Sequence, residues 1–530
     1  MRKDTKRNLF IAATYGAVLL LGLMLGQHYA DDNKRTGAAT LLPLGLGYTG
    51  KVQHIIDLIT TNYVDSVDVG QLQHQAIGEI ISRLDPYSEY LYPQTVLARR
   101  QTLEGSFEGI GIEYYKLLDT IVTVGLIAGG PAEQGGLRAG DRLIAIDGDT
   151  IAGVNVSEKT IAEKIRGQIG TPIHIEVLRN GHMLSHSLTV MRGQVAVSSI
   201  DAAYALDSIT AYIKVKRFGA KTAEEFSEAL NELKSAGAQR LILDLRENGG
   251  GYFDAATALA SQFFDHRELL VYTEGAHEPR TNYYSTTNGL FGKGQLVVLI
   301  DEQSASASEI VAGAVQDLNR GVVVGRRSFG KGLVQEQFGF GDGSALNLTV
   351  ARYYTPSGRC IQKAYPKNSA VFVAMRPQET RTPADTTSAM LHQRHESLVH
   401  PSDSSGGIVP DIWAPASDQD TSKWYQRVRA ANLIEEYVYG SLARTVPGYS
   451  AENFLAKYKL PAAAYERFLA YAKTRGITCS AREAQALKPY ICRDMEALLG
   501  RFYFGREIFF RVQNRTDKML ATALNALAGG

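Results

Sequence analysis

The chain has 530 residues, of which 45% are hydrophobic and 21% charged, so it is long enough for several globular domains with a large buried core. Its 56 basic and 55 acidic residues leave a formal charge of +1, which provides neither a basic surface for nucleic acid nor an acidic tail, and we expect no nucleic-acid partner. Cys360, Cys479 and Cys492 lack metal-ligand spacing, so no metal site is predicted, although Cys479 and Cys492 remain candidates for a disulfide.

The N-terminus has the pattern of a membrane anchor. Residues 1–7 are rich in Arg and Lys, residues 9–26 form an apolar run without a charge, and residues 31–32 are both aspartate. The positive-inside rule then places everything beyond residue 30 outside the cytoplasm. A cleaved signal peptide is the alternative, but residues 27–30 lack the small residue expected three positions before a cut. We therefore predict that residues 1–30 are a cytoplasmic flank and an uncleaved anchor.

The next two segments differ in their hydrophobic period. Residues 48–100 are predicted to be helical, because apolar side chains between Lys51 and Leu91 recur every three or four residues. Residues 101–194 are predicted to form a small β-rich domain, in which glycine-containing turns separate short apolar runs. These runs are Ile121–Val124, Arg142–Ile146 and Ile173–Val177.

Residues 200–420 show buried strands that alternate with helices, which predicts an α/β core with a largely parallel sheet. The predicted strands are Leu241–Leu245, Leu296–Ile300 and Val322–Val324, and the predicted helices are Phe253–Phe264 and Ser306–Leu318. Residues 366–407, rich in Ser, Thr, Pro and His, are interpreted as a polar insertion. Residues 422–530 are predicted to form a helical C-terminal region, with a hypothesised role in homo-oligomerisation or adaptor docking.

The densest group of chemically useful side chains is Ser304-Ala-Ser306-Ala-Ser308-Glu309, which follows the strand ending at Ile300 and opens a helix. A small-residue turn at such a junction exposes a side chain and directs backbone N–H groups outward. A serine there can act as a nucleophile beside an oxyanion hole. The alternative interpretation is that Ser304 or Ser306 only caps the helix.

Lys331 follows the next predicted strand and is flanked by Gly330 and Gly332. A lysine can serve as a general base if burial lowers its pKa toward neutrality; the alternative is a solvated surface lysine. Residues 325–331 also match most of the phosphate-binding pattern G-x-x-x-x-G-K. However, Gly332 stands where Ser or Thr would bind magnesium, and a strand-like alternation follows, so a nucleotide hydrolase is the weaker hypothesis.

A glycine cluster, Asn248-Gly249-Gly250-Gly251, follows the strand Leu241–Leu245. It can bring backbone amides close to a substrate carbonyl, although a flexible turn is the alternative. The 11 histidines are scattered, and none lies in a comparable turn, so a Ser-His-Asp triad has no obvious base. The lysine is the better candidate.

Together these segments resemble the carboxyl-terminal processing peptidases, also called tail-specific proteases. The resemblance covers most of residues 50–415. It rests on the ordered motifs Leu84-Asp-Pro-Tyr-Ser88, Asp244-Leu-Arg-Glu-Asn-Gly-Gly-Gly251, Ser304-Ala-Ser-Ala-Ser-Glu-Ile310, Phe329-Gly-Lys-Gly-Leu-Val-Gln335, Tyr353-Tyr-Thr-Pro-Ser-Gly-Arg359 and Gly407-Ile-Val-Pro-Asp411. It implies a serine endopeptidase that needs no cofactor and processes or degrades proteins outside the cytoplasm, on the periplasmic side of a bacterial inner membrane.

The resemblance also implies the roles of individual residues. Ser306 would be the nucleophile, Lys331 the general base, and Gln335 would orient the lysine. The oxyanion would be bound by the amide of Ala307 and by a glycine of the triple-glycine turn, Gly251 by alignment. Many relatives have proline where this chain has Gly249, which leaves open whether Gly250 or Gly251 is the donor.

The β-rich residues 101–194 resemble a PDZ domain whose carboxylate-binding loop is Gly109-Ile110-Gly111-Ile112. Consecutive amides of such a loop can hold the terminal carboxylate of a protein substrate, while the substrate's tail adds to the sheet edge as a strand. The resemblance further implies that Arg166 couples the PDZ position to the active site. The alternatives are a β-domain that binds nothing and a PDZ scaffold without activity, and the intact Ser306, Lys331 and Gln335 argue against the scaffold.

Overall fold

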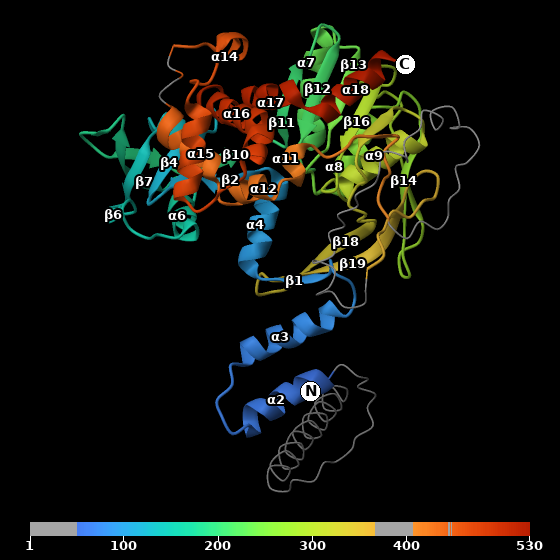
Figure 1. Cartoon of the computed structure of the whole chain (residues 1–530). Helices are drawn as coiled ribbons and strands as arrows, with labels where there is room; N and C mark the ends of the chain where they lie inside the picture. The colour runs from blue at the N-terminus through green and yellow to red at the C-terminus, as the bar shows by residue number, and fades with distance from the viewer. Residues whose placement is uncertain (1–49, 366–405, 444–445, 447, 530) are drawn as a thin grey trace, which may run out of the picture. The chain divides into compact units, whose positions relative to one another are not determined.

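The computed structural model describes residues 50–365, 406–443, 446 and 448–529 (Figure 1). The predicted anchor, residues 1–30, lies outside this range, as does nearly all of the predicted polar insertion. Within the described range, no helix combines the length and apolarity that a membrane crossing requires.

The chain divides into two compact units, residues 1–77 and 78–530. The first contains α2 (Lys51–Asn62) and the start of α3 (Val69–Ser82), and the second opens with β1 (Glu89–Leu91) and α4 (Pro93–Glu104). Most of the described part of the predicted helical segment is thus helical. The short strand β1 was not predicted.

The main sheet of the second unit has six strands in the order β11-β12-β13-β16-β17-β20. β11 and β12 pair antiparallel, and the other four pairings are parallel. Parallel pairing needs crossovers, which α7, α8 and α9 supply for the pairings from β12 to β17. The bounds are β11 Ile200–Ala205, β12 Thr210–Val215, α7 Thr222–Ser235, β13 Arg240–Asp244, α8 Phe253–Ser261, β16 Gln295–Ile300, α9 Ala307–Asp317, β17 Val322–Gly325 and β20 Ile412–Trp413.

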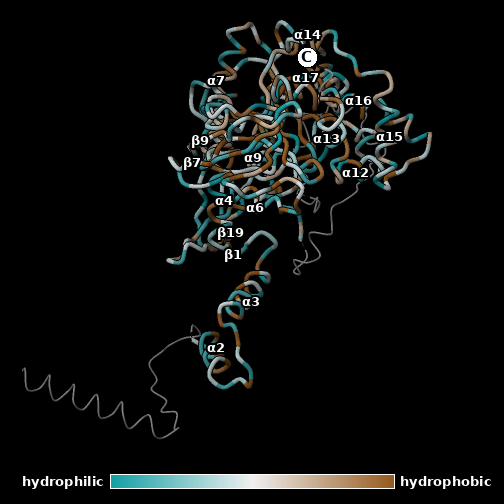
Figure 2. The backbone as a smooth tube through the Cα atoms, turned by 90° about the vertical axis from the view of Figure 1, so that its left-hand side faces the viewer, coloured by the Kyte–Doolittle hydropathy of each residue, from teal (hydrophilic) through white to brown (hydrophobic). Residues whose placement is uncertain are grey.

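This sheet is buried on both faces, which explains its continuous apolar strands. Leu241 and Leu243 belong to a core shared with α7, α8 and α9, whereas Ile242 faces the opposite way, into a core shared with α18 (Lys518–Ala528). Figure 1 shows α18, in dark red, beside β16, and Figure 2 shows hydrophobic residues, in brown, around α9. The last helix of the C-terminal region therefore completes the main sheet.

A second, five-stranded sheet has the order β1-β19-β14-β15, with β18 also paired to β19, and all its pairings are antiparallel. Its other strands are β14 Leu269–Glu274, β15 Thr281–Tyr284, β18 Leu333–Gly339 and β19 Ala345–Tyr354. The prediction of a largely parallel core sheet therefore describes the six-stranded sheet only. The antiparallel sheet was missed because its strands pair with distant segments, including β1 of the helical N-terminal segment.

A seven-stranded antiparallel sheet has the order β3-β4-β5-β7-β8, with β6 paired to β5 and β9 to β7. Its edge strand β3 pairs with β4 alone, so among the described strands its other edge is open. The chain enters this domain through β2 and leaves it through β10, which pair with each other. The bounds are β2 Ser106–Gly109, β3 Ile112–Leu117, β4 Thr120–Leu126, α5 Pro131–Gln134, β5 Arg142–Ile146, β6 Asp149–Thr150, α6 Glu158–Ile165, β7 Pro172–Arg179, β8 His182–Met183, β9 Leu188–Met191 and β10 Gly193–Ala196.

The C-terminal helices form their own hydrophobic cluster, which includes Val124 of β4 and so extends onto the β-rich domain. Arg506 of α17 reinforces this contact by pairing with Glu113 of β3 and with Asp201 of β11. Cys479 and Cys492 are free thiols, so the candidate disulfide is not formed. The helices are α11 Asp418–Thr421, α12 Lys423–Ala430, α13 Leu433–Tyr437, a π-helical turn Val438–Leu442, α14 Ala451–Lys457, α15 Ala464–Thr474, α16 Ala481–Phe504, α17 Arg506–Gln513, a 3₁₀ turn Asn514–Thr516 and α18.

Candidate active site

Ser306 lies on a sharp turn between the end of β16 and the start of α9. Its backbone has φ 55° and ψ −113°, a conformation that residues other than glycine rarely adopt. The side chain is half-buried, whereas the neighbouring Ala305 and Ala307 are buried. The turn therefore holds a single hydroxyl at the surface of a rigid junction, as a serine nucleophile requires.

The carboxylate of Glu309, one turn into α9, joins the serine turn to the lysine turn. It is fully buried and accepts hydrogen bonds from the backbone N–H groups of Ser306 (2.8 Å), Gly330 (2.7 Å) and Lys331 (2.9 Å). The Ser328 hydroxyl also donates to it. Burial raises the pKa of Glu309, and these four donors oppose that increase by stabilising the ionised form.

The Lys331 amine contacts Gln335 and, through Gln335, the segment around Tyr87, which lies much earlier in the chain. Its Nζ donates to Oε1 of Gln335 (2.7 Å), and the Gln335 Nε2 in turn donates to the backbone carbonyl of Tyr87 (2.6 Å). This second bond fixes which end of the amide faces the lysine. The Tyr87 ring also lies against the amine, with its centroid 5.1 Å from Nζ.

The surroundings of Lys331 favour a neutral amine. Burial lowers the pKa of Lys331 below the usual lysine value, and nearby Arg99 acts in the same direction. The carboxylates of Glu89, Asp85 and Glu309 oppose this change but do not reverse it. The pKa of the side chain is thus shifted in the direction that a general base at moderate pH requires.

The structure brings Ser306 and Lys331 together through their backbones. The Tyr353 hydroxyl donates to the backbone carbonyls of both Ser306 (3.0 Å) and Lys331 (2.7 Å). Among the described contacts, no hydrogen bond joins Ser306 Oγ to Lys331 Nζ. Catalytic hydrogen bonds in enzymes without substrate are often long or misaligned, so this geometry leaves the pair as a candidate.

The glycine-rich turn after β13 packs directly against the serine turn. A side chain at Gly250 would place its Cβ 2.9 Å from the Ser306 Cβ and 3.2 Å from the Ala307 nitrogen. The N–H of Gly250 donates to the side-chain oxygen of Asn248 (2.9 Å). By contrast, the N–H groups of Gly251 and Ala307 have no acceptor among the described residues. Of the two glycines considered, Gly251 is therefore the one whose amide is available to an oxyanion.

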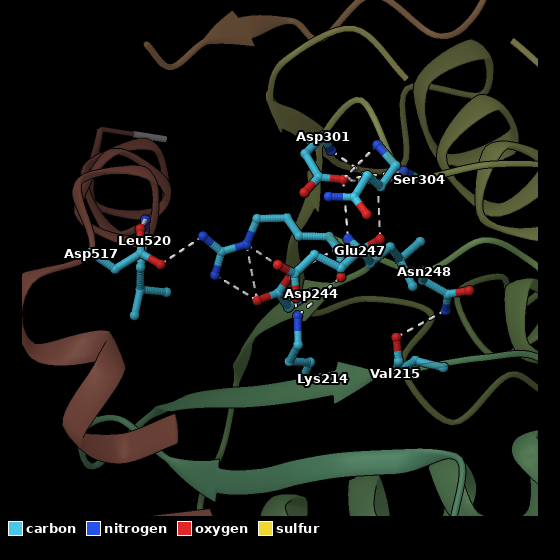
Figure 3. A network of polar contacts seen from close by, with 12 residues as sticks. Lys214, Val215, Asp244, Glu247, Asn248, Asp301, Ser304, Asp517 and Leu520 are labelled. Atoms are coloured by element: carbon cyan, nitrogen blue, oxygen red, sulfur yellow. Dashed lines mark hydrogen bonds and ion pairs between the residues drawn. The ribbon is translucent and has the colours of Figure 1, made fainter. Parts of the chain in front are cut away.

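A buried polar network holds this turn in place (Figure 3). Asn248 Nδ2 donates to the carbonyl of Val215 (2.9 Å), and its own carbonyl accepts hydrogen bonds from Ala305 N (3.0 Å) and Ser308 Oγ (2.9 Å). Asp301 accepts hydrogen bonds from the backbone N–H groups of Glu247 and Ser304, which joins the two turns again.

The same network reaches the C-terminal helix. Asp244, at the end of β13, is fully buried, and Arg246 and Lys214 hold the pKa of its carboxyl well below the usual range although burial alone would raise it. Arg246 also pairs with Asp517, which accepts hydrogen bonds from the first N–H groups of α18 (Figure 3). The end of β13, from which the glycine turn leaves, is therefore tied to the helix that covers the back of the sheet.

The predicted carboxylate loop, residues 109–112, lies between β2 and the edge strand β3. The N–H groups of Ile110 and Gly111 have no acceptor among the described residues, whereas their carbonyls accept hydrogen bonds from Ala132 and Ile127. Arg166 caps the C-terminal end of α6, and its guanidinium lies 5.3 Å from the Phe107 ring centroid. No described hydrogen bond or ion pair connects Arg166 to the serine or lysine turn.

Known proteins share these sequence features. Residues 209–367 match the model of peptidase family S41, residues 122–179 match a PDZ domain, and residues 424–505 match a family of unknown function. The carboxy-terminal-processing protease of Bartonella bacilliformis is 34% identical over 358 residues, which cover 67% of this chain and 79% of that protein. The chain belongs to this family of serine peptidases.

Two other known proteins are similar to this chain over different shares of its length. The carboxy-terminal processing protease CtpB of Bacillus subtilis is 34% identical over 317 residues, which span 59% of this chain and 65% of that protein. Among solved structures, a photosystem II D1 C-terminal processing protease is 26% identical, with 69% of this chain and 87% of that chain covered and a TM-score of 0.35. The C-terminal region lies outside the S41 match, which ends at residue 367.

Sequence reasoning missed several residues that contact the serine and lysine turns of the candidate site. Glu309 stands three positions after the cap residue Ser306, which is the spacing of a capping box. Its contact with the serine turn could therefore have been predicted from the sequence. Tyr353 and Tyr87 lie in motifs that supported the resemblance, but no local pattern indicates that they reach Ser306 or Lys331. Only the folded chain brings them there.

Proposed function

We propose that this peptidase cleaves protein substrates with Ser306 as the nucleophile and Lys331 as the general base. The observation that carries the proposal is a lysine of lowered pKa whose turn shares Glu309 and Tyr353 with the strained turn of Ser306. No metal or cofactor takes part in the proposed reaction.

In the first half-reaction, neutral Lys331 Nζ takes the proton from Ser306 Oγ while that oxygen attacks the scissile carbonyl carbon. The oxyanion that forms accepts hydrogen bonds from the N–H groups of Ala307 and Gly251. Lys331 then gives its proton to the leaving amine as the peptide bond breaks, which leaves an acyl ester on Ser306. Gln335 keeps the lysine in line throughout.

In the second half-reaction, Lys331 removes a proton from water, and the resulting hydroxide attacks the acyl carbon. The tetrahedral intermediate collapses, and the Ser306 oxygen leaves and recovers its proton from the lysine. The carboxylic product then departs. The same base and the same two amides thus serve both steps.

We further propose that the domain around residues 101–194 captures the C-terminal tails of substrates. The open N–H groups of Ile110 and Gly111 suit a terminal carboxylate, and the open edge of β3 suits an added strand. Gly109 and Ile112 complete this loop. The assignment of Arg166 as the residue that couples this domain to the active site rests on the family resemblance alone.

The proposed location is extracytoplasmic, with the chain anchored by residues 1–30, on the basis of the basic and apolar pattern of that segment. The proposed domains are the helical segment 48–100, the PDZ domain 101–194, the peptidase core 200–420 and the C-terminal region 422–530. The C-terminal region is proposed to mediate self-association, in which case analytical ultracentrifugation of the intact chain should give a particle mass that is a multiple of the chain mass.

The test compares cleavage of an unstructured protein with an apolar C-terminus by the wild-type chain and by Ser306→Ala and Lys331→Ala. We expect both variants to lose cleavage while circular dichroism shows an unchanged fold. Matched substitutions of exposed residues, Ser208→Ala and Lys293→Ala, should retain full activity. An active Ser306→Ala or Lys331→Ala protein would contradict the proposal. Tail capture is tested separately: if the tail is captured, a substrate whose C-terminal residues are changed to aspartate should be cleaved more slowly by the wild-type chain.

A further inference from the structure

A cavity of about 590 Å³ lies where the β-rich domain meets the C-terminal helices. The β-rich domain contributes Lys116, Asp119 and Glu158 to its wall, and the C-terminal region contributes Asn432, Glu436 and Arg475. The Tyr115 hydroxyl donates to the Asn432 carbonyl (3.2 Å) across this boundary. The cavity is distinct from the serine and lysine turns, and none of its lining residues has been given a role above.

The cavity lies at the far end of the proposed tail-binding groove. The proposed groove is bounded by the open edge of β3 and by helix α6, which approach each other at both ends. A Cβ on Gly109 would be 3.5 Å from the backbone of Ile165 and Arg166, and Lys116 donates to the carbonyl of Val156 just before α6. Lys116 and Asp119 lie at the other end of β3 and just beyond it, and Glu158 is the first residue of α6. A tail bound in the groove must therefore leave it beside the cavity.

The cavity wall has three acidic side chains, Asp119, Glu158 and Glu436, and two basic ones, Lys116 and Arg475, so its formal charge is −1. Lys116 Nζ donates to the carbonyl of Val156 (2.7 Å), and Arg475 pairs with Glu436 (2.8 Å). Asp119 and Glu158 have no cationic partner among the described residues. Burial, followed by Glu435, Glu436 and Glu158, raises the pKa of the Tyr115 hydroxyl, which agrees with a negative potential at this position.

We propose that this cavity is a subsite for the upstream part of the substrate tail and that it binds a lysine or arginine side chain there. The proposal rests on tail capture by the loop at residues 109–112. A tail that pairs along the whole of β3 uses about six residues at roughly 3.3 Å each, so the residues about six to eight positions from the terminal carboxylate reach the cavity. Specificity would then depend on the C-terminal region as well as on the PDZ domain.

The test measures peptide binding by calorimetry to the full-length chain with Ser306→Ala, which prevents turnover. Three peptides share the same apolar last five residues. The first consists of these five alone, the second is a decapeptide with lysine at positions six to eight from its C-terminus, and the third has glutamate at those positions. We expect the lysine decapeptide to bind about tenfold more tightly than the glutamate decapeptide, with the pentapeptide between them.

Two charge-reversal variants distinguish a specific subsite from general electrostatic attraction between the peptide and the domain. Glu158→Lys should remove or reverse the preference for lysine and leave pentapeptide binding unchanged. Glu163→Lys makes the same charge change on an exposed residue of α6 that is not part of the cavity wall, and the preference should persist. Equal binding of the two decapeptides, or equal effects of the two substitutions, would overturn the subsite while leaving tail capture intact. If no peptide binds, tail capture fails and the subsite with it, whereas cleavage by Ser306 and Lys331 is decided separately by the substitutions at those residues.

Discussion

The serine turn and the lysine turn of the candidate active site are held in different ways. The serine turn depends mainly on its own strained backbone and on buried hydrogen bonds to the neighbouring glycine turn, and both turns follow strands of the main sheet. The amine of Lys331 instead depends on Gln335 and, through it, on the backbone of Tyr87, which lies 248 residues earlier in the chain than Gln335. The proposed nucleophile is thus positioned chiefly by turns at the ends of main-sheet strands, and the proposed base is positioned by a segment much earlier in the chain.

That difference has a physical origin. A short side chain on a strand-to-helix turn is positioned by the sheet itself, so a sharp turn is enough to hold it in place. A flexible lysine side chain has several rotatable bonds, so other groups must restrict its amine. The segment around Asp85 and Tyr87 supplies this restriction, since Asp85 Oδ1 accepts hydrogen bonds from the N–H groups of Tyr87 and Ser88 (both 2.8 Å).

The largest effect is expected for Glu309→Gln, because this substitution disturbs the hydrogen bonds of both the serine turn and the lysine turn. Glutamine has one acceptor oxygen, and its NH₂ group would face donors that Glu309 now satisfies, at a cost of about 1–3 kcal/mol for each donor left unpaired. We expect the free energy of unfolding, measured by chemical denaturation, to fall by roughly 3 kcal/mol or more, with loss of activity. The control Glu302→Gln changes an exposed carboxylate and should have little effect; equal stabilities of the two variants would contradict the bridging role.

A smaller effect is expected when only the lysine side is loosened, in Asp85→Ala. The turn at Tyr87 loses its side-chain acceptor, so Gln335 and Lys331 lose their alignment. We expect kcat to fall by about 10- to 100-fold with little change in KM, because a misplaced base affects the chemical step.

Asp207→Ala is the matched control for that substitution. Asp207 accepts hydrogen bonds from the N–H groups of Ile209 and Thr210 in the same pattern, but in the hairpin between β11 and β12. Its loss should leave kcat unchanged. If both variants lower kcat equally, or if Asp85→Ala changes only thermal stability, the positioning role of the Tyr87 segment is wrong.

Tyr353→Phe should have a moderate effect, because it removes the hydroxyl that joins the carbonyls of Ser306 and Lys331. The two turns remain connected through Glu309. We expect a loss of about 1–2 kcal/mol in the free energy of unfolding and a several-fold fall in kcat. A variant with wild-type kcat would show that Glu309 alone is enough to hold the serine turn and the lysine turn in their relative positions.

The smallest effect is expected for Asp85→Asn, which keeps the acceptor oxygen but removes the charge. Only the neutral amine of Lys331 can take a proton, so kcat/KM should rise with pH through a pKa that burial lowers below that of free lysine. The negative charge of Asp85 favours the protonated amine, so its removal should shift this rise to lower pH. A shift to higher pH, or a wild-type profile flat until strongly alkaline pH, would contradict the assignment of Lys331 as the base.

The sequence by itself determined the elements and residues whose signals are local. Strands such as β5, with the predicted bounds Arg142–Ile146, follow from short apolar runs between glycine turns. Ser306 and Lys331 were selected because each follows a buried strand in a turn of small residues. The loop at residues 109–112 was implied by the resemblance to a PDZ domain and not by a local pattern, and the strand β3 beside it was not predicted.

Only the tertiary structure decided what depends on distant segments. It brought the Tyr87 carbonyl to Gln335, left the amide of Gly251 open while Asn248 took that of Gly250, and placed α18 against the back of the main sheet. It also formed a charged cavity from two regions whose sequences show no relation. The physical reason is that hydrogen bonds and burial are set by which atoms meet in space, whereas hydrophobic periodicity reports only on the few residues around each position.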